Sequence, residues 1–316
     1  MDVKLYLFPE NFRYNGVDTE TVFVKKFRNF IRDLSEIVSQ DKKRVTILIP
    51  QDFYSIPVFL EKDIVAIAVE YLEPDEQSLL YATLYNTSMM EEGHDVEIIK
   101  KQTLYSKDEE FCVSTIVFNS TEANRDNRKY IEFEQYKIVY TYNSWVYLKR
   151  QILGNHPDTS KAFMKECKTC FPDIKFSCNC EIVIGDYLKK IPRKIVYYLS
   201  CMNDKLINFY NNYPNPNAMN DLLADFSGRY GMDKAGSLQM TANKKTNYTF
   251  DFVNTSGDIK KKVCDPHFKI QHYDSNCSCV PNADSEKCYG RIYFCLDKNE
   301  KDESLELFVG SIGPHV

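Results

Sequence analysis

The residues of this sequence that are best suited to chemistry lie near its C-terminal end, in short segments where apolar and polar side chains alternate. They combine imidazoles, cationic side chains and a phenol: His267, Lys269, Arg291, Tyr293 and His315. An imidazole can take or give a proton near neutral pH, and lysine or arginine can stabilise negative charge in a transition state. Such a set could cleave RNA without a metal, with a histidine as base or acid, the two cations beside the phosphorane, and the tyrosine stacking or relaying a proton.

Strict alternation predicts that four segments in this region are strands of one antiparallel meander. The segments are YTFDFV (248–253), HFKIQHY (267–273), GRIYFCL (290–296) and LELFVGSI (305–312). If their apolar side chains face a core, the chemical side chains of the middle two strands share the opposite, solvent-facing side. A plain alternative stays open, because the wet face of any half-buried sheet carries lysine, arginine, tyrosine and histidine.

A second group of residues has the spacing of a metal site. Four cysteines follow the pattern C-x2-C-x7-C-x-C: Cys167, Cys170, Cys178 and Cys180. Four thiolates at this spacing could hold one tetrahedral zinc ion. The alternative is that they are free, mostly buried thiols, because a chain of 316 residues does not need a structural metal. We expect no cofactor, with a structural zinc at these cysteines as the alternative.

Further cysteines and histidines occur in the segment CDPHFKIQHYDSNCSC (264–279). His267 and His272 are five positions apart, so on a regular strand they point to opposite faces, which disfavours a zinc site. We interpret the end of this segment as a loop with free cysteines. The chain has 11 cysteines, an odd number, and in a reducing compartment we expect them to be mostly free thiols.

The N-terminal portion, residues 1–142, predicts an α/β unit that opens with the strand VKLYLF (3–8). A helix should follow, with Asp18 as its N-cap. Its apolar residues recur at spacings of three and four: Phe23, Phe27, Phe30, Ile31, Leu34, Ile37 and Val38. Buried strands are predicted at RVTILIP (44–50) and DIVAIAVEYL (63–72), and further strands near 96–104, 111–118 and 129–142.

Residues 143–217 predict a helical connecting segment, and residues 218–316 a C-terminal module that contains the antiparallel sheet. We interpret NNYPNPNA (211–218) as a loop or linker. A short helix should follow it, with Gly228 and Gly231 as terminators. The predicted fold class is therefore α+β, with an α/β unit, a helical middle and a C-terminal sheet module.

Composition narrows the classes of function. No segment is long and apolar enough for a membrane span and the N-terminus lacks a signal-peptide pattern, so we expect a cytoplasmic protein without membrane contact. A net charge of -5 argues against a protein that coats nucleic acid, although IKKK (259–262) could contribute a local basic patch. Motifs for phosphate loops, dinucleotide binding, zinc proteases and serine esterases are absent.

One helix followed by antiparallel strands that end in RIYFCL and LELFVGSIGPHV gives the last roughly 100 residues a likeness to a known family. They resemble the closing hairpin of RelE-type toxins, which are small ribosome-dependent or free ribonucleases. The resemblance implies Arg291 as the residue that stabilises transition-state charge, Tyr293 on the same face and His315 near the active centre. The segment CDPHFK is also similar to the tails of uncharacterised bacterial proteins encoded beside mobile-element and phage-defence genes.

Two hypotheses about function follow. The first is a bacterial toxin or anti-phage defence component whose C-terminal module binds or cleaves RNA without a metal. The second is a non-catalytic subunit of a multi-protein defence complex. In the second case the N-terminal and helical parts would bind a partner protein encoded nearby.

Overall fold

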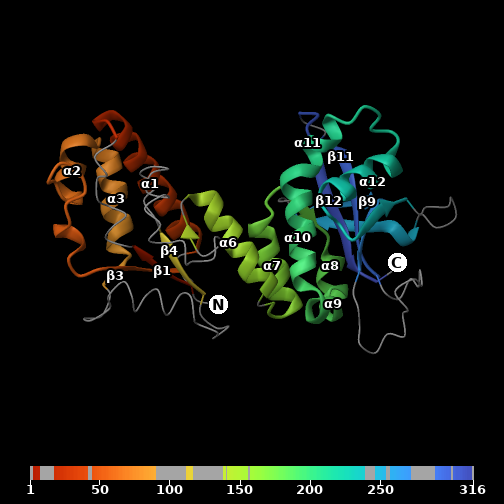
Figure 1. Ribbon diagram of the computed structural model, residues 1–316. Helices are drawn as coiled ribbons and strands as arrows, with labels where there is room; N and C mark the ends of the chain where they lie inside the picture. The colour runs from red at the N-terminus through yellow and green to blue at the C-terminus, as the bar shows by residue number, and fades with distance from the viewer. Residues whose placement is uncertain are drawn as a thin grey trace. The chain divides into compact units, whose positions relative to one another are not determined.

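The computed structural model contains helices and several sheets, so the predicted α+β class is confirmed (Figure 1). It describes residues 3–7, 18–41, 45–89, 112–116, 138–139, 141–155, 157–238, 246–253, 257–271, 289–299 and 302–314. The chain forms two compact units, residues 1–149 and residues 150–316. Over the residues just given, no helix combines the length and the apolar character that crossing a bilayer requires.

The N-terminal unit is built on a parallel sheet of five strands in the order β3-β2-β1-β4-β5. The strands are β1 (Val3–Leu7), β2 (Val45–Ile49), β3 (Ser88–Met89), β4 (Cys112–Ile116) and β5 (Ile138–Val139). Parallel neighbours need crossover connections, which are supplied here by α1 (Glu20–Asp41), a 3-10 turn (Phe53–Ser55), α2 (Ile64–Tyr71) and α3 (Pro74–Tyr85). In Figure 1, α1 and α3 lie side by side on one face of this sheet.

Helix α1 confirms the predicted apolar stripe. Its buried residues are Phe23, Phe27, Phe30, Ile31, Leu34 and Ile37. The predicted cap is wrong by one position: the backbone N–H of Val22 donates to Thr19 Oγ1 at 3.4 Å, which makes Thr19 the N-cap. Asp18 instead accepts from Lys26 Nζ at 3.1 Å, so it holds the first two turns of the helix through an ion pair.

The strand predicted at residues 63–72 is wrong, because this segment forms helix α2. Its apolar run is continuous, and such a run fits a buried strand and a buried helix equally well. Local capping favours the helix: Asp63 accepts a hydrogen bond from the backbone N–H of Ala66 at 2.8 Å. Two residues separate α2 from helix α3, which starts with a capping box between Glu73 and Glu76. The strand predicted near 96–104 lies outside the described residues.

The C-terminal unit contains a five-stranded sheet in the order β6-β12-β11-β10-β7 and a separate two-stranded sheet, β8-β9. The strands are β6 (Ile174–Phe176), β7 (Lys234–Ser237), β8 (Thr249–Val253), β9 (Ile259–Val263), β10 (His267–Gln271), β11 (Tyr289–Lys298) and β12 (Leu305–Gly313). Three of the four predicted strands, β10, β11 and β12, form the expected antiparallel meander. The fourth, β8, pairs with β9 instead, and β6 joins the meander in parallel with β12.

The helices predicted for residues 143–217 belong to the same core as this sheet. They are α7 (Ser160–Cys170), α8 (Cys178–Val183), α9 (Gly185–Lys190), α10 (Pro192–Cys201), a π-helical turn (Met202–Leu206) and α11 (Ile207–Asn211), and α12 (Met219–Arg229) follows. Helix α6 (Tyr142–Asn155) spans the boundary between the two units and adds Leu153 to this core. From α12, Phe226 reaches Phe268 in β10 with ring centroids 5.5 Å apart, and Phe268 stacks on Phe294 in β11 at 5.1 Å. One hydrophobic cluster joins helices α7 to α12 to one face of the sheet.

A buried arginine ties the first helix of this unit to the π-helical turn. The guanidinium of Arg150 donates to both carboxylate oxygens of Asp204, at 2.6 and 3.0 Å, and its Nε donates to the carbonyl of Cys170 at 2.9 Å. Burial alone would raise the pKa of Asp204, but the hydrogen bonds from Arg150 and Asn203 outweigh it and lower this pKa.

We expect acid to remove the stabilisation that this carboxylate provides. Because the pKa of Asp204 is lower in the folded chain than in the unfolded chain, its contribution is complete above an unfolded value of about 4 and is lost as the pH falls through the folded value. Urea unfolding measured from pH 6 to pH 2.5 should show a smaller acid-induced loss in Asp204→Asn than in the unchanged chain. Equal losses in the two proteins would contradict this assignment.

Candidate functional site

The structure brings four of the five predicted catalytic residues together. Strands β10 and β11 pair so that His267 lies opposite Tyr293 and Lys269 lies opposite Arg291. The rings of His267 and Tyr293 have centroids 5.0 Å apart. The fifth residue, His315, lies outside the described residues. The register therefore agrees with one shared face for this group.

The predicted exposure of that face is wrong. His267 and Tyr293 have no exposed surface, and Arg291 is 2% exposed, while Lys269 is half-buried. The β8-β9 hairpin covers part of this face, with the ring of Tyr248 5.6 Å from that of Tyr293. In this conformation a substrate in solution does not reach His267, Arg291 or Tyr293, so the role of the group in cleavage stays a prediction.

His267 is held as a buried, hydrogen-bonded ring. Its Nε2 lies 3.4 Å from Ser237 Oγ, and its Nδ1 lies 3.3 Å from the backbone oxygen of Asp265. Buried polar groups are normally satisfied in this way, and the contacts join the ring to β7 on one side and to the β9-β10 connection on the other. This geometry suits a residue that fixes neighbouring strands.

The four cysteines predicted as zinc ligands do not all point to one place. Cys167, Cys170 and Cys180 are buried, whereas Cys178 is exposed. Cys178 and Cys180 are two positions apart on helix α8, so their side chains leave it in roughly opposite directions. Burial raises the pKa of Cys167, and it raises that of Cys180 to about 12, so both side chains are neutral thiols in the metal-free chain. Across the described part of the chain, no three or more potential ligands are grouped for a metal.

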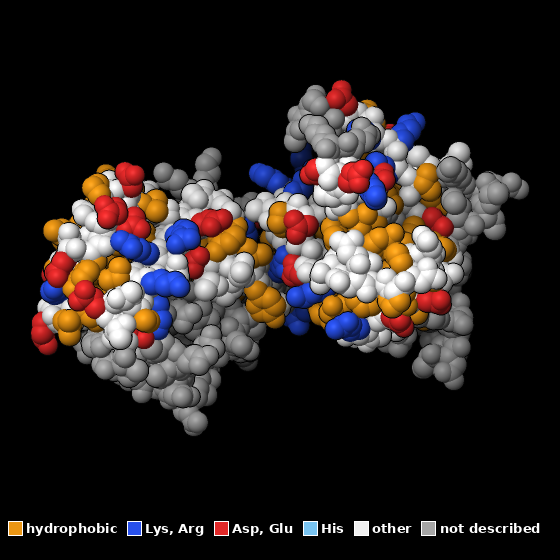
Figure 2. Space-filling view, turned by 90° about the horizontal axis from the view of Figure 1, so that it is seen from above, with side chains coloured by type: hydrophobic (Ala, Val, Ile, Leu, Met, Phe, Trp, Pro, Cys, Tyr) orange, Lys and Arg blue, Asp and Glu red, His pale blue; other side chains and the backbone are white. Residues whose placement is uncertain are grey.

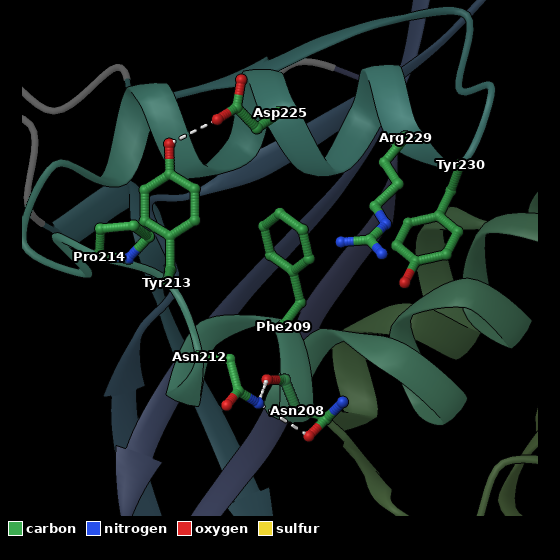
Figure 3. A pocket seen from close by; sticks show the side chains of 8 residues that line it. All are labelled: Asn208, Phe209, Asn212, Tyr213, Pro214, Asp225, Arg229 and Tyr230. Carbon is green, nitrogen blue, oxygen red and sulfur yellow. Dashed lines mark hydrogen bonds between the residues drawn. The ribbon is translucent and has the colours of Figure 1, made fainter.

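A pocket of about 380 Å³ lies elsewhere in the C-terminal unit, between α11 with the loop after it and α12 (Figure 3). It is lined by Asn208, Phe209, Asn212, Tyr213, Pro214, Asp225, Arg229 and Tyr230. The three aromatic residues are half-buried and form its floor, while the polar residues and the proline are exposed at its rim. An apolar floor inside a polar rim is the usual make-up of a ligand or partner site.

The floor is fixed by aromatic contacts between the two helices. Phe209 meets Phe226 of α12 edge to face, with centroids 5.2 Å apart, and lies 5.6 Å from Tyr213. The hydroxyl of Tyr197 in α10 donates to the backbone carbonyl of Tyr230, which fixes the end of α12 beside the pocket. The π-helical turn immediately before α11 is of a kind often found next to functional sites.

The rim presents both donors and acceptors. Figure 3 shows Tyr213 and Asp225 joined at one side of the pocket and Arg229 at the other. The hydroxyl of Tyr213 donates to Asp225 at 2.7 Å, and this hydrogen bond, together with burial, raises the pKa of Tyr213 to about 12, so the phenol stays neutral. The guanidinium of Arg229 lies 5.9 Å from the Phe209 ring centroid, and the amide of Asn212 donates to Asn208 Oδ1 at 3.0 Å. These groups can orient a bound molecule; nothing in their arrangement resembles a nucleophile paired with a base.

Sequence reasoning missed this pocket, because residues 211–218 were interpreted as a loop or linker. The signal that could have found it is the run NFYNNYP, which places three aromatic side chains among amides over seven residues.

Comparison of the chain with models of protein families, with curated proteins and with solved structures finds no match. The resemblance to RelE-type toxins therefore remains a prediction.

Proposed function

We propose that this chain is a non-catalytic binding protein that receives a short peptide segment of a partner protein in the pocket between α11 and α12. The observation that carries the proposal is the pocket itself: a half-buried aromatic floor beneath exposed amide, carboxylate and guanidinium groups. An apolar side chain of the peptide would rest on Phe209 and Tyr230. Its backbone would hydrogen-bond to Asn208 and Asn212 at the rim.

Charge favours a peptide over a nucleic acid strand at this site. Arg229 is the cation of the pocket lining, and it shares the rim with the carboxylate of Asp225. A phosphate backbone is bound by several clustered cations, and the whole chain carries a net charge of -5. One arginine beside one carboxylate instead suits a peptide that has a single acidic residue next to its apolar anchor.

The N-terminal unit offers a second surface of the kind that partner proteins cover. Figure 2 shows hydrophobic side chains interspersed with charged ones on this unit. Two exposed hydrophobic residues of this unit are Val69 of α2, which is 64% exposed, and Tyr85 of α3, which is 90% exposed. Burying such residues would favour association through the hydrophobic effect, which supports the hypothesis of a subunit in a larger complex.

RNA binding is the second candidate, and it would fit the expectation of a toxin or defence component. The aromatic floor with Arg229 above Phe209 favours it, because bases stack on aromatic rings and on guanidinium planes. In this version the pocket would hold an unpaired base. Cleavage through His267 and Arg291 would additionally require the covered face of the sheet to open.

We expect a displayed library of random peptides to yield ligands that share an aromatic or aliphatic anchor next to an acidic residue. Binding of the selected peptide should weaken about 10-fold or more in Asn208→Ala and in Arg229→Ala, because each removes a rim contact. Isothermal titration calorimetry would measure this loss. Lys165→Ala, which removes an exposed cation from α7 of the same unit, is the matched control and should bind normally.

Titration of the same variants with single-stranded RNA oligonucleotides, measured by fluorescence anisotropy, distinguishes peptide binding from RNA binding. RNA binding that disappears in Arg229→Ala, together with failure to select any peptide, would overturn the peptide proposal in favour of the second candidate. If the selected peptides bind Arg229→Ala and the unchanged chain equally, the pocket is not their binding site, and the peptide proposal fails.

A further inference from the structure

Two cysteines that are far apart in sequence meet where the β8-β9 hairpin joins the main sheet of the C-terminal unit. Cys264 follows β9 directly, and Cys295 lies in β11. Their Sγ atoms are 3.6 Å apart, although the residues are separated by 31 positions. Cys264 is completely buried, whereas Cys295 is partly exposed. The pair thus combines one partly exposed cysteine with one fully buried cysteine.

Aromatic and ionic contacts also join the hairpin to the sheet. The rings of Phe252 and Phe308 meet edge to face at 5.2 Å, and Lys262 forms an ion pair with Asp297, two positions beyond Cys295 in β11. A disulfide has its sulfurs about 2.05 Å apart, so closing the gap between the two thiols takes a movement of about 1.5 Å. A movement of this size is within the range of side-chain rotations.

We propose that Cys264 and Cys295 are a redox modification site, at which a low-molecular-weight disulfide such as glutathione disulfide oxidises both thiols to a disulfide that fastens the hairpin to β11. This inference does not rest on the proposed function, because the cysteine pair is not part of the pocket lining. The reagent class follows from access. Cys295 is only partly exposed, and a small disulfide needs less room to approach it than a protein does.

The reaction balances in two exchange steps. The thiolate of Cys295 attacks one sulfur of the reagent, forms a mixed disulfide and expels one reagent thiolate. Cys264 then loses its proton and attacks Sγ of Cys295, which expels the second reagent thiolate. Two protein thiols are oxidised, the reagent disulfide is reduced to two thiols, and the two protons that the cysteines lose are taken up by the products.

The order of the two steps follows from the surroundings of Cys264. The hydrogen bond to Cys295 and burial raise the pKa of Cys264 well above its usual range, so it remains a thiol until Cys295 has reacted. A third thiol, Cys180, is also near enough to Cys264 to influence this pKa. Cys180 is buried, so the reagent has no route to it that compares with the route to Cys295.

Once formed, the bond would hold the hairpin over the face that contains His267 and Tyr293. It would close a loop of about 30 residues, and a restraint of this size usually stabilises the folded state. We expect the melting temperature of the oxidised protein to exceed that of the same sample after dithiothreitol by roughly 5 to 10 °C. The gain should be absent in Cys295→Ser.

The decisive experiment is incubation of the full chain with glutathione disulfide, blocking of free thiols by alkylation, and tryptic mass spectrometry. Cleavage after Lys262, Lys269, Arg291 and Lys298 places each sulfur in its own peptide, VCDPHFK and IYFCLDK. We expect these two peptides joined by a disulfide, and their separation on reduction. The joined pair should be missing in Cys295→Ser, while Cys178→Ser, which removes an exposed thiol elsewhere, should leave it unchanged.

Three results would overturn the inference. The first is complete alkylation of both cysteines after the incubation. The second is a glutathione adduct on Cys295 that does not proceed to the joined peptides. The third is a disulfide between Cys264 and Cys180 in place of the expected one.

Discussion

Replacing Tyr293 by alanine should lower the free energy of unfolding of the C-terminal unit by about 3 to 5 kcal/mol, the usual cost of removing a fully buried aromatic ring. Tyr293 has no exposed surface and packs between the ring of His267 in β10 and the ring of Tyr248, the residue just before β8. Its removal leaves a cavity between the main sheet and the hairpin. Urea unfolding followed by circular dichroism would measure the loss, and hydrogen exchange of β11 peptides would locate it.

The matched control is Tyr289→Ala in the same strand. Tyr289 is only partly buried, so we expect a loss of about 1 kcal/mol or less. A Tyr293→Ala variant as stable as this control would show that the hairpin does not cover the sheet in solution. The result also bears on any test of RNA cleavage: activity lost in a Tyr293 or His267 variant counts as catalytic only if the variant remains folded.

Replacing Arg150 by methionine should have the second large effect and lower the free energy of unfolding by about 2 to 4 kcal/mol. The substitution keeps much of the apolar stem of the side chain. It removes the guanidinium, whose Cζ lies 4.9 Å from the ring centroid of Phe171. It removes the two hydrogen bonds to Asp204 and leaves the carbonyl of Cys170 without the donor it has now. The Asp204 side chain is 39% exposed, so water can solvate the remaining carboxylate, and this keeps the loss below that of a fully buried pair.

An exposed ion pair in the same unit supplies the comparison. Lys175 pairs with Glu306 at 2.5 Å, but its side chain is 53% exposed. Lys175→Met should therefore change the unfolding free energy by less than about 1 kcal/mol in the same urea experiment. Equal losses in Arg150→Met and Lys175→Met would contradict the view that burial makes the first pair important.

Local patterns predicted much of the fold. The apolar stripe of α1 and the alternation in β10, β11 and β12 were read correctly, because each pattern needs only one buried face. The strand predicted for 63–72 is wrong because a continuous apolar run has no period, and the Asp63 cap is the local feature that distinguishes a helix from a strand here. The pairing of β6 with β12 could not be predicted, since a three-residue strand has no pattern of its own.

The sequence also predicted that the sheet would bring His267, Lys269, Arg291 and Tyr293 to one face, but it did not predict the cover over them. Alternation with polar residues is the same whether the second face meets water or a hairpin, because buried polar side chains can be satisfied locally, as His267 is. The pocket was missed for a related reason. Its floor exists only when Phe209 and Tyr230 from separate helices are brought together by tertiary packing.

The pairing of β6 with β12 also affects the order in which the C-terminal unit can fold during protein synthesis, because β12 is made long after β6. Ser177, just after β6, hydrogen-bonds to Gly310 in β12, a residue 133 positions later. At a translation rate of about 5 to 20 residues per second, β6 waits roughly 7 to 25 seconds before its partner strand is made. During this interval β6 has no strand to pair with, although β10 is made earlier and brings Phe268 to Tyr198 of α10. Pairing of β6 with β12 is therefore expected to be among the last steps by which the C-terminal unit folds.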